Sequence, residues 1–106
     1  MTDSKAKGAR GERELSNVLN LHGFDCRRGQ QFCGANGDAD VVGLPGIHIE
    51  CKRVERLNLS DAMSQSISDA KMGNIPTVMH RKNHEEWLVT MRLSDWIAFY
   101  KDYMPI

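Results

Sequence analysis

The sequence has few cysteines, and their positions do not suggest a disulfide framework. Cys26, Cys33 and Cys51 are an odd number, and no two of them form a Cys-x-x-Cys pair. Such usage is typical of a reducing compartment. Cys26 and Cys33 could be combined with His80 and His84 into a zinc site, but the cysteine spacing is too wide for a zinc-finger knuckle. We therefore expect free cysteines.

Long apolar runs are also missing. No stretch approaches the roughly 18 apolar residues of a membrane span, and the first residues are polar, unlike those of a secretory signal. The chain has 106 residues, of which 41% are hydrophobic and 26% are charged. These values are typical of one globular domain over residues 1–106, and we expect a soluble, cytoplasmic protein without a membrane partner.

An excess of charge of one sign is absent, since 14 basic side chains balance 14 acidic ones. The overall charge therefore does not indicate a nucleic-acid partner. Basic residues nevertheless gather in four short segments, which could form a phosphate-binding surface if the fold brings them to one side. These residues are Lys5, Lys7, Arg10 and Arg13, then Arg27 and Arg28, then Lys52, Arg53 and Arg56, and finally Arg81 and Lys82.

Hydrophobic periodicity predicts the order helix, three strands, helix, two strands, helix. Residues 1–7 lack periodicity and are expected to be a flexible basic arm, and residues 29–38 are expected to be a loop. The predicted helices cover residues 8–22, a segment from Ser60 to Gly73, and the C-terminal segment after Ser94, the two serines being N-caps. The predicted strands cover residues 24–28, 41–42, 47–52, 77–80 and 87–91. This order predicts an α/β sandwich with a mixed central sheet of about five strands.

Two apolar sets are expected to cover this sheet. Alternation along residues 24–28 places Phe24 and Cys26 on the inner side of the first strand. In the last helix, the apolar stripe is expected to be core or subunit contact rather than a platform for stacked bases. The stripe consists of Trp96, Ile97, Phe99 and Tyr100.

Charged residues accompany two of the predicted strands. Glu50 and Lys52 stand two residues apart in an apolar run, so their side chains share one face of the strand. If residues 41–42 and 47–49 form neighbouring strands joined through Pro45-Gly46, Asp40 reaches the same face. Asp38 is the alternative first carboxylate, because alternation puts it on the side of Asp40. A purely structural interpretation is an exposed Glu–Lys pair, which contributes at most about 1 kcal/mol.

The pattern of Asp40 followed by Glu-x-Lys resembles the active-site signature of the PD-(D/E)XK nucleases. More closely, the chain resembles the small archaeal-type Holliday junction resolvases and their phage relatives. Three segments carry the resemblance: Gly-Ala-Arg-Gly-Glu-Arg-Glu-Leu at residues 8–15, Ala-Asp-Val-Val at 39–42, and Ile-Glu-Cys-Lys at 49–52. The resemblance implies a restriction-endonuclease-like core with the order αβββαββα, which periodicity also predicts.

The chemistry of these residues suits phosphodiester hydrolysis. Oxygen ligands from Asp40 and Glu50 suit Mg²⁺, for which Mn²⁺ is expected to substitute, and the backbone carbonyl of Cys51 would be a third ligand. Lys52 would hold or help to deprotonate the attacking water and stabilise the transition state. The resemblance adds Glu12, which would serve a second metal or act through water. A solvated helical glutamate is the alternative for Glu12.

The resemblance also implies what the protein acts on. Lys7, Arg10, Arg28 and Arg53 would contact phosphates without reading bases, and Gln65 would lie near the scissile phosphate, a solvated glutamine being the alternative. The implied enzyme is a homodimeric endodeoxyribonuclease that nicks four-way DNA junctions symmetrically in a bacterial or phage-infected cell. Two alternatives remain: a nuclease on flaps, nicked or plain duplex DNA, and a DNA-binding module without catalysis.

Overall fold

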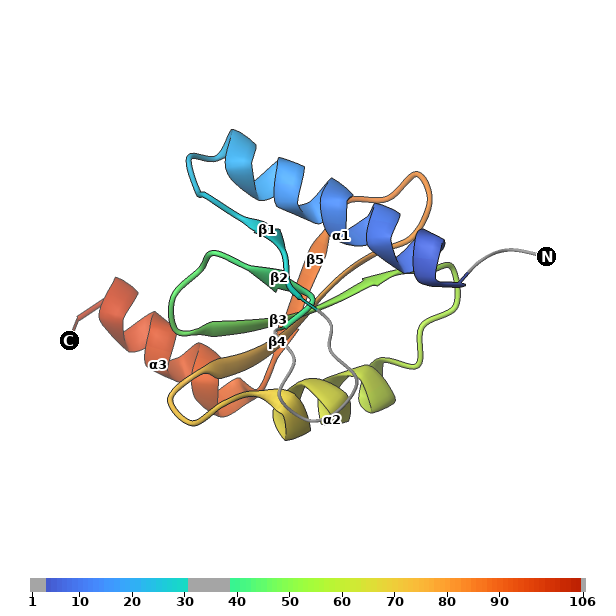
Figure 1. Ribbon diagram of the computed structural model, residues 1–106. Helices are drawn as coiled ribbons and strands as arrows, with labels where there is room; N and C mark the ends of the chain where they lie inside the picture. The colour runs from blue at the N-terminus through green and yellow to red at the C-terminus, as the bar shows by residue number, and fades with distance from the viewer. Residues whose placement is uncertain (1–3, 31–38, 106) are drawn as a thin grey trace.

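The computed structural model describes residues 4–30 and 39–105 of the chain. The helices and strands follow the predicted order, which is confirmed (Figure 1). They are α1 (Ser4–Leu21), β1 (Arg27–Arg28), β2 (Val41–Val42), β3 (Ile47–Arg53), α2 (Leu59–Asp69), β4 (Ile75–Arg81), β5 (Leu88–Met91) and α3 (Leu93–Tyr103). Most of the predicted loop over residues 29–38, with Cys33 and Asp38, lies outside the described residues. No helix in the described ranges is long and apolar enough to cross a membrane.

The five strands form one sheet in the order β1-β2-β3-β4-β5. β1, β2 and β3 pair antiparallel, β3 and β4 pair parallel, and β4 and β5 pair antiparallel. The sheet is therefore mixed, as predicted. Helix α1 lies over one side of the sheet and α2 lies on the other (Figure 1). The parallel neighbours β3 and β4 are joined through α2, which gives the crossover that parallel strands require.

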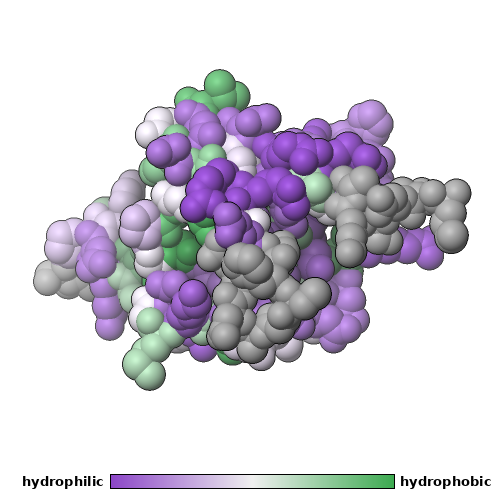
Figure 2. Space-filling model, in the orientation of Figure 1, coloured by the Kyte–Doolittle hydropathy of each residue, from purple (hydrophilic) through white to green (hydrophobic). Residues whose placement is uncertain are grey.

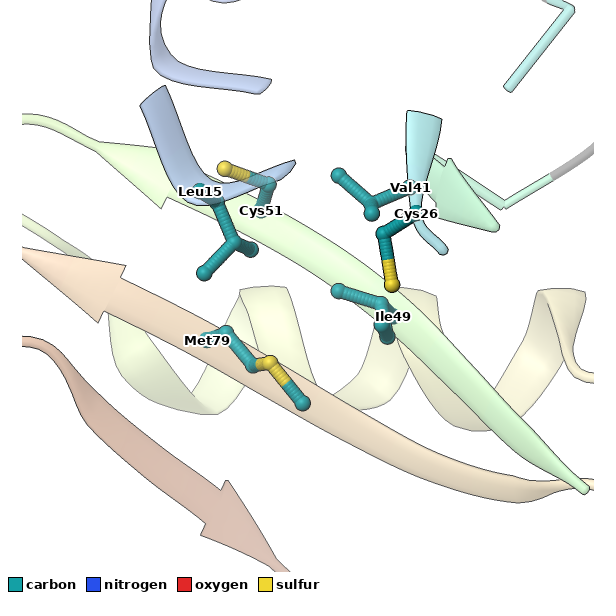
Figure 3. Packing of buried hydrophobic residues seen from close by; sticks show 6 residues of the cluster. All are labelled: Leu15, Cys26, Val41, Ile49, Cys51 and Met79. Atoms are coloured by element: carbon teal, nitrogen blue, oxygen red, sulfur yellow. The ribbon is translucent and has the colours of Figure 1, made fainter. Parts of the chain in front are cut away.

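The core lies between α1 and the sheet, and Figure 3 shows six of its side chains. Leu15 points from α1 onto β3, where Ile49 is fully buried and Cys51 is nearly so. Successive strand residues face opposite sides. Because Ile49 and Cys51 face α1, Glu50 and Lys52 share the other face, as alternation predicts. The cluster comprises Leu15, Cys26, Val41, Ile49, Cys51 and Met79.

Helix α1 begins earlier than predicted and approaches β3 closely. The expected flexible arm over residues 1–7 is wrong for residues 4–7, which form the first turn of α1, because lysine and alanine favour a helix and no proline intervenes. Gly23, with φ of 93°, ends the helix in the left-handed conformation, as predicted. Gly11 faces β3, and a Cβ on it would lie 2.6 Å from Arg53 Cβ. Only glycine at position 11 permits this approach.

Three local predictions are wrong. β1 contains only Arg27 and Arg28, and Phe24 is half exposed although Cys26 is buried as expected. Asn58, not Ser60, caps α2, because the Asn58 side chain accepts a hydrogen bond from Asp61 N at 3.1 Å. The helix also ends at Asp69, before the predicted stop at Gly73, since Ala70 already has extended backbone.

Helix α3 is also different from the prediction. Its N-cap is Arg92 rather than Ser94, and no side chain caps it. None of its residues is buried, so the apolar stripe does not cover the sheet within this chain. The exposed fractions are 50% for Trp96, 40% for Ile97, 44% for Phe99 and 47% for Tyr100. The interpretation of this stripe as core is therefore wrong, and its interpretation as subunit contact stays a prediction.

Candidate active site

The predicted catalytic residues line one cavity of about 430 Å³ at the C-terminal half of β3. Helix α1 contributes residues of its N-terminal half to the wall. Predicted residues that line it are Lys7 and Glu12 from α1, Asp40 from the start of β2, and Glu50, Cys51, Lys52 and Arg53 from β3. Segments separated by up to about 45 residues of sequence therefore meet at one place.

Asp40 is held in the cavity by its own backbone and by its side chain. Its N–H donates to Ile49 O at 3.0 Å and its carbonyl accepts from Gly29 N at 2.9 Å, so the residue extends the pairing of β2 with both neighbours. The carboxylate Oδ2 accepts a 2.8 Å hydrogen bond from the main-chain N–H of Cys51. This bond orients Asp40 toward the segment that carries Glu50 and Lys52.

Several acidic side chains lie close together in the cavity. The pKa of Asp40 is raised to about 7, chiefly by burial and also by the neighbouring carboxylates of Glu50 and Glu12, whereas the Cys51 N–H and Lys52 oppose this rise. Carboxylates that share a poorly solvated site repel each other unless a cation or a proton neutralises them. The site therefore favours a positive ion.

Glu50 and Lys52 lie on the same face of β3, because successive strand residues alternate between the two faces. Glu50 is 9% exposed, whereas Lys52 is half-buried and pairs in register with His80 on β4. Among the residues that the structure describes, Lys52 forms no ion pair within 4 Å. Its ammonium group lowers the pKa of Asp40, which places it close to the acids. The amine is thus available to a substrate.

Glu12 joins the site from α1. It is 9% exposed and stands one turn before the core residue Leu15, which turns it toward the sheet. Glu12 Oε1 lies 3.0 Å from Arg28 Nε. Arg28 therefore forms an ion pair with this acid instead of being free to contact a phosphate. The expectation of a fully solvated Glu12 is therefore not met, whereas its role at the site stays a prediction.

Cys51 serves the site through its main chain. Its thiol points toward Leu15 in the core (Figure 3), and burial raises the thiol pKa to about 12, with the nearby carboxylates adding to the effect. The sulfur therefore stays protonated at neutral pH and is a poor metal ligand. This arrangement is compatible with the predicted use of the backbone carbonyl.

The predicted phosphate-contacting residues are distributed around the cavity. Lys7 lines it, and Arg10 is exposed on α1 outside it. Arg53 also lines it but lies 3.3 Å from Glu14. Gln65 lines an adjoining groove together with Lys52, and its side chain donates to Asp69 at 2.7 Å. Figure 2 shows that hydrophilic side chains cover much of α1 on the face in view.

Sequence analysis missed two residues near the site. Glu14 accepts hydrogen bonds from Arg53 and Arg81, and so connects α1 to the ends of β3 and β4. His48 is 6% exposed and its Nε2 lies 3.7 Å from Glu50 Oε1. The alternation that places Glu50 and Lys52 on one face also places His48 there, so the pattern could have identified it. Glu14 carries no such signal, because its partners are distant in sequence.

The donor set fits a hard divalent cation. In the part of the chain described here, no three His, Cys, Asp or Glu side chains converge closely enough to form a complete metal site by themselves. Mg²⁺ is commonly bound through one or two carboxylates and keeps several waters. The carboxylates of the partly buried Asp40 and the buried Glu50 meet this requirement.

Comparisons with known proteins bear on the fold. No protein-family model and no curated protein sequence matches the chain. Among solved structures, the chain is similar to Hjc, a Holliday junction resolvase from the archaeal hyperthermophile Archaeoglobus fulgidus, with a TM-score of 0.60 and 27% sequence identity. The similarity covers 80% of this chain and 72% of the archaeal one. The predicted resemblance and the restriction-endonuclease-like fold are confirmed.

Proposed function

We propose that this protein is a metal-dependent endodeoxyribonuclease that resolves four-way DNA junctions by paired nicks. The observation that carries the proposal is the meeting of Asp40, Glu50 and Lys52 in one cavity of a fold shared with a Holliday junction resolvase. Because one fold can host many functions, the residues of the site support the proposal more strongly than the fold does. The same three residues carry the sequence resemblance to the PD-(D/E)XK nucleases.

The acids and the main chain of β3 would hold the cation. Asp40 and Glu50 supply carboxylate oxygens, the Cys51 carbonyl supplies a third, and Glu12 contributes through water or to a second ion. When bound, Mg²⁺ or Mn²⁺ polarises a phosphate oxygen and lowers the pKa of water. The Cys51 N–H keeps one Asp40 oxygen directed along β3, so the carboxylate is oriented before a ligand arrives.

Lys52 would act on the reacting groups. Hydrolysis forms a bond from the water oxygen to phosphorus and breaks the bond to the 3′-oxygen, which leaves with a proton. The Lys52 ammonium stands on the acid face of β3, where it can hold the attacking water and stabilise charge that develops on the phosphate. Its position beside the acids, without an ion pair among the described residues, supports this role.

Substrate DNA would lie across α1 and the cavity mouth. Lys7 and Arg10 are exposed there and would contact phosphates, which provides affinity without reading bases. Gln65 borders Lys52 from α2 and would approach the scissile phosphate. Arg28 and Arg53 have carboxylate partners, so their contacts to DNA would require an exchange of those ion pairs. Recognition by shape rather than by sequence follows from this arrangement.

Paired nicks require two active sites, and the exposed face of α3 supports a homodimer. A helix that buries none of its residues leaves its apolar stripe in water, which is unfavourable for residues as large as Trp96 and Tyr100. Their rings stack with centroids 5.3 Å apart, and both residues are about half exposed, so together they form an apolar area on α3. A second copy of the chain packed on α3 would cover this area and bring a second active site.

Cleavage of a labelled four-way junction tests the proposal. The junction and a duplex of the same sequence are incubated with the protein in Mg²⁺, and the products are separated by size. Nicks in the junction alone, in two opposed strands, are the expected result. Cutting of both substrates would instead make the protein a general nuclease, and retention of DNA without products in Mg²⁺ or Mn²⁺ would make it a binding module.

A further inference from the structure

His48 is a buried polar residue that the proposed mechanism does not use. It stands two residues before Glu50 on β3, and both side chains are nearly inaccessible to solvent. Within the described residues, His48 Nε2 has no hydrogen-bond partner. A buried polar group without a partner destabilises the fold, so its presence in a folded protein calls for an explanation.

A chain of hydrogen bonds from α2 through β4 holds the backbone of His48 in place. The His48 carbonyl accepts a 2.8 Å hydrogen bond from the Thr77 hydroxyl on β4. The Thr77 carbonyl in turn accepts one from the Ser66 hydroxyl on α2, also at 2.8 Å. Thr77 and Ser66 are buried, so this chain of bonds is shielded from water. The imidazole therefore projects from a well-defined position.

The unpartnered nitrogen lies close to the Glu50 carboxylate, at 3.7 Å from Nε2 to Oε1. This is longer than a hydrogen bond, and a shift of under about 1 Å brings the two atoms into the usual range. A neutral imidazole with its proton on Nε2 can donate this bond, and Glu50 can accept it on one oxygen while the other remains directed to the cavity.

We propose that His48 is a positioning residue that donates from Nε2 to Glu50 Oε1 and so orients the Glu50 carboxylate for the divalent cation. This inference rests on the proposed function, since it assigns Glu50 to a metal. Groups that hold a metal-binding carboxylate by a hydrogen bond typically change metal affinity by about 10–100-fold when removed. His48 does not touch substrate or metal in this assignment, and its effect passes through Glu50.

Binding of Mn²⁺ alone, followed by electron paramagnetic resonance of the free ion, tests the assignment without DNA or turnover. His48→Leu removes the donor at similar volume, and it should weaken Mn²⁺ binding by about 10–100-fold. His48→Gln places an amide N–H near the position of Nε2, and it should bind within a few-fold of the wild type. Asn20→Ala is the control, because it removes partly buried hydrogen bonds to Cys26, none of which involves His48 or Glu50.

The outcomes separate this inference from the proposed function. Wild-type protein that binds no Mn²⁺ would overturn both. Wild-type binding with an equal affinity in His48→Leu, or an equal loss in Asn20→Ala, would overturn the role of His48 alone. Should His48→Leu fail to fold, His48→Asn replaces it. The asparagine side chain is too short to place an N–H group at the position of His48 Nε2, so this variant also lacks the donor. A cleavage assay should then show a higher Mg²⁺ requirement in His48→Asn and an unchanged rate at saturating Mg²⁺.

Discussion

The main-chain N–H of Cys51 donates a 2.8 Å hydrogen bond to Asp40 Oδ2 and so joins the start of β2 to the strand between Glu50 and Lys52. The bond keeps a carboxylate in a buried place beside another acid, where burial and that acid raise its pKa to about 7. The unfolded chain has the ordinary value of 3.8. The ionised form of Asp40 is therefore less stable in the folded protein than in the unfolded chain.

This difference predicts a pH-dependent gain of stability in Asp40→Asn. The cost of ionising Asp40 is absent below pH 3.8, grows as the pH rises and is complete above about 7. Without metal, Asp40→Asn should match the wild type near pH 4 and exceed it by on the order of a few kcal/mol at pH 8. Urea unfolding at both pH values measures this. An equal difference at the two pH values would show that Asp40 is not perturbed.

Lys52→Ala should reduce junction cleavage by about 100-fold or more, because it removes the positive charge beside the reacting phosphate. Junction binding, measured by gel shift in Ca²⁺, should change little, since Lys52 is one of several basic groups. Lys71→Ala, an exposed lysine between α2 and β4, is the matched control and should cleave at the wild-type rate. Full activity in Lys52→Ala would refute the role assigned to this amine.

Gly11→Ala should destabilise the protein by about 1–3 kcal/mol, because the new Cβ would lie 2.6 Å from Arg53 Cβ and would push α1 away from β3. Gly8→Ala is the control on the same helix, where no atom lies within 4 Å of the added Cβ. Since alanine favours a helix more than glycine does, Gly8→Ala should stabilise by up to about 1 kcal/mol. Thermal unfolding of both variants compares them, and two shifts of the same sign would contradict the close packing of Gly11.

Glu14→Ala should cost about 1 kcal/mol of stability, because Glu14 is the acid that both Arg53 and Arg81 contact. A double-mutant cycle with Arg81→Ala measures the pairwise part of this energy. A favourable coupling is expected, and it should weaken in high salt, since the residues are partly solvated. Additive losses would mean that the ion pair between α1 and β4 contributes no coupling.

Trp96→Glu should dissociate the proposed dimer, because it places a charge in the exposed apolar face of α3. Sedimentation equilibrium should give twice the chain mass for the wild type and the single-chain mass for the variant. Leu21→Glu, at a still more exposed apolar position at the end of α1, is the control and should remain dimeric. A monomeric wild type, or a dimeric Trp96→Glu, would argue against α3 as the subunit contact.

The order of helices and strands was predicted from hydrophobic periodicity, and the shared face of Glu50 and Lys52 was predicted because strand alternation is a local geometric property. Sequence reasoning also brought Asp40 to the same place, since a short turn at Pro45-Gly46 sets the register of the two strands. The helix starts were less predictable, because Asn58 and Ser60 are both good caps and the difference between them is small.

The remaining differences arise from contacts between distant segments. An apolar stripe such as that of α3 has the same sequence pattern whether it is covered by its own sheet or by another molecule. The network of Glu14 depends on how α1 crosses the ends of two strands, which composition does not encode. His48 differs from these, because its burial follows from alternation, and only its distance to Glu50 needed the structure.

Anomalous diffraction from crystals grown with Mn²⁺ tests the central claim most directly. The account predicts a peak within direct coordinating distance, about 2.0–2.4 Å, of carboxylate oxygens from both Asp40 and Glu50. A peak bound to neither residue, or no peak at saturating Mn²⁺ near pH 8, would contradict it.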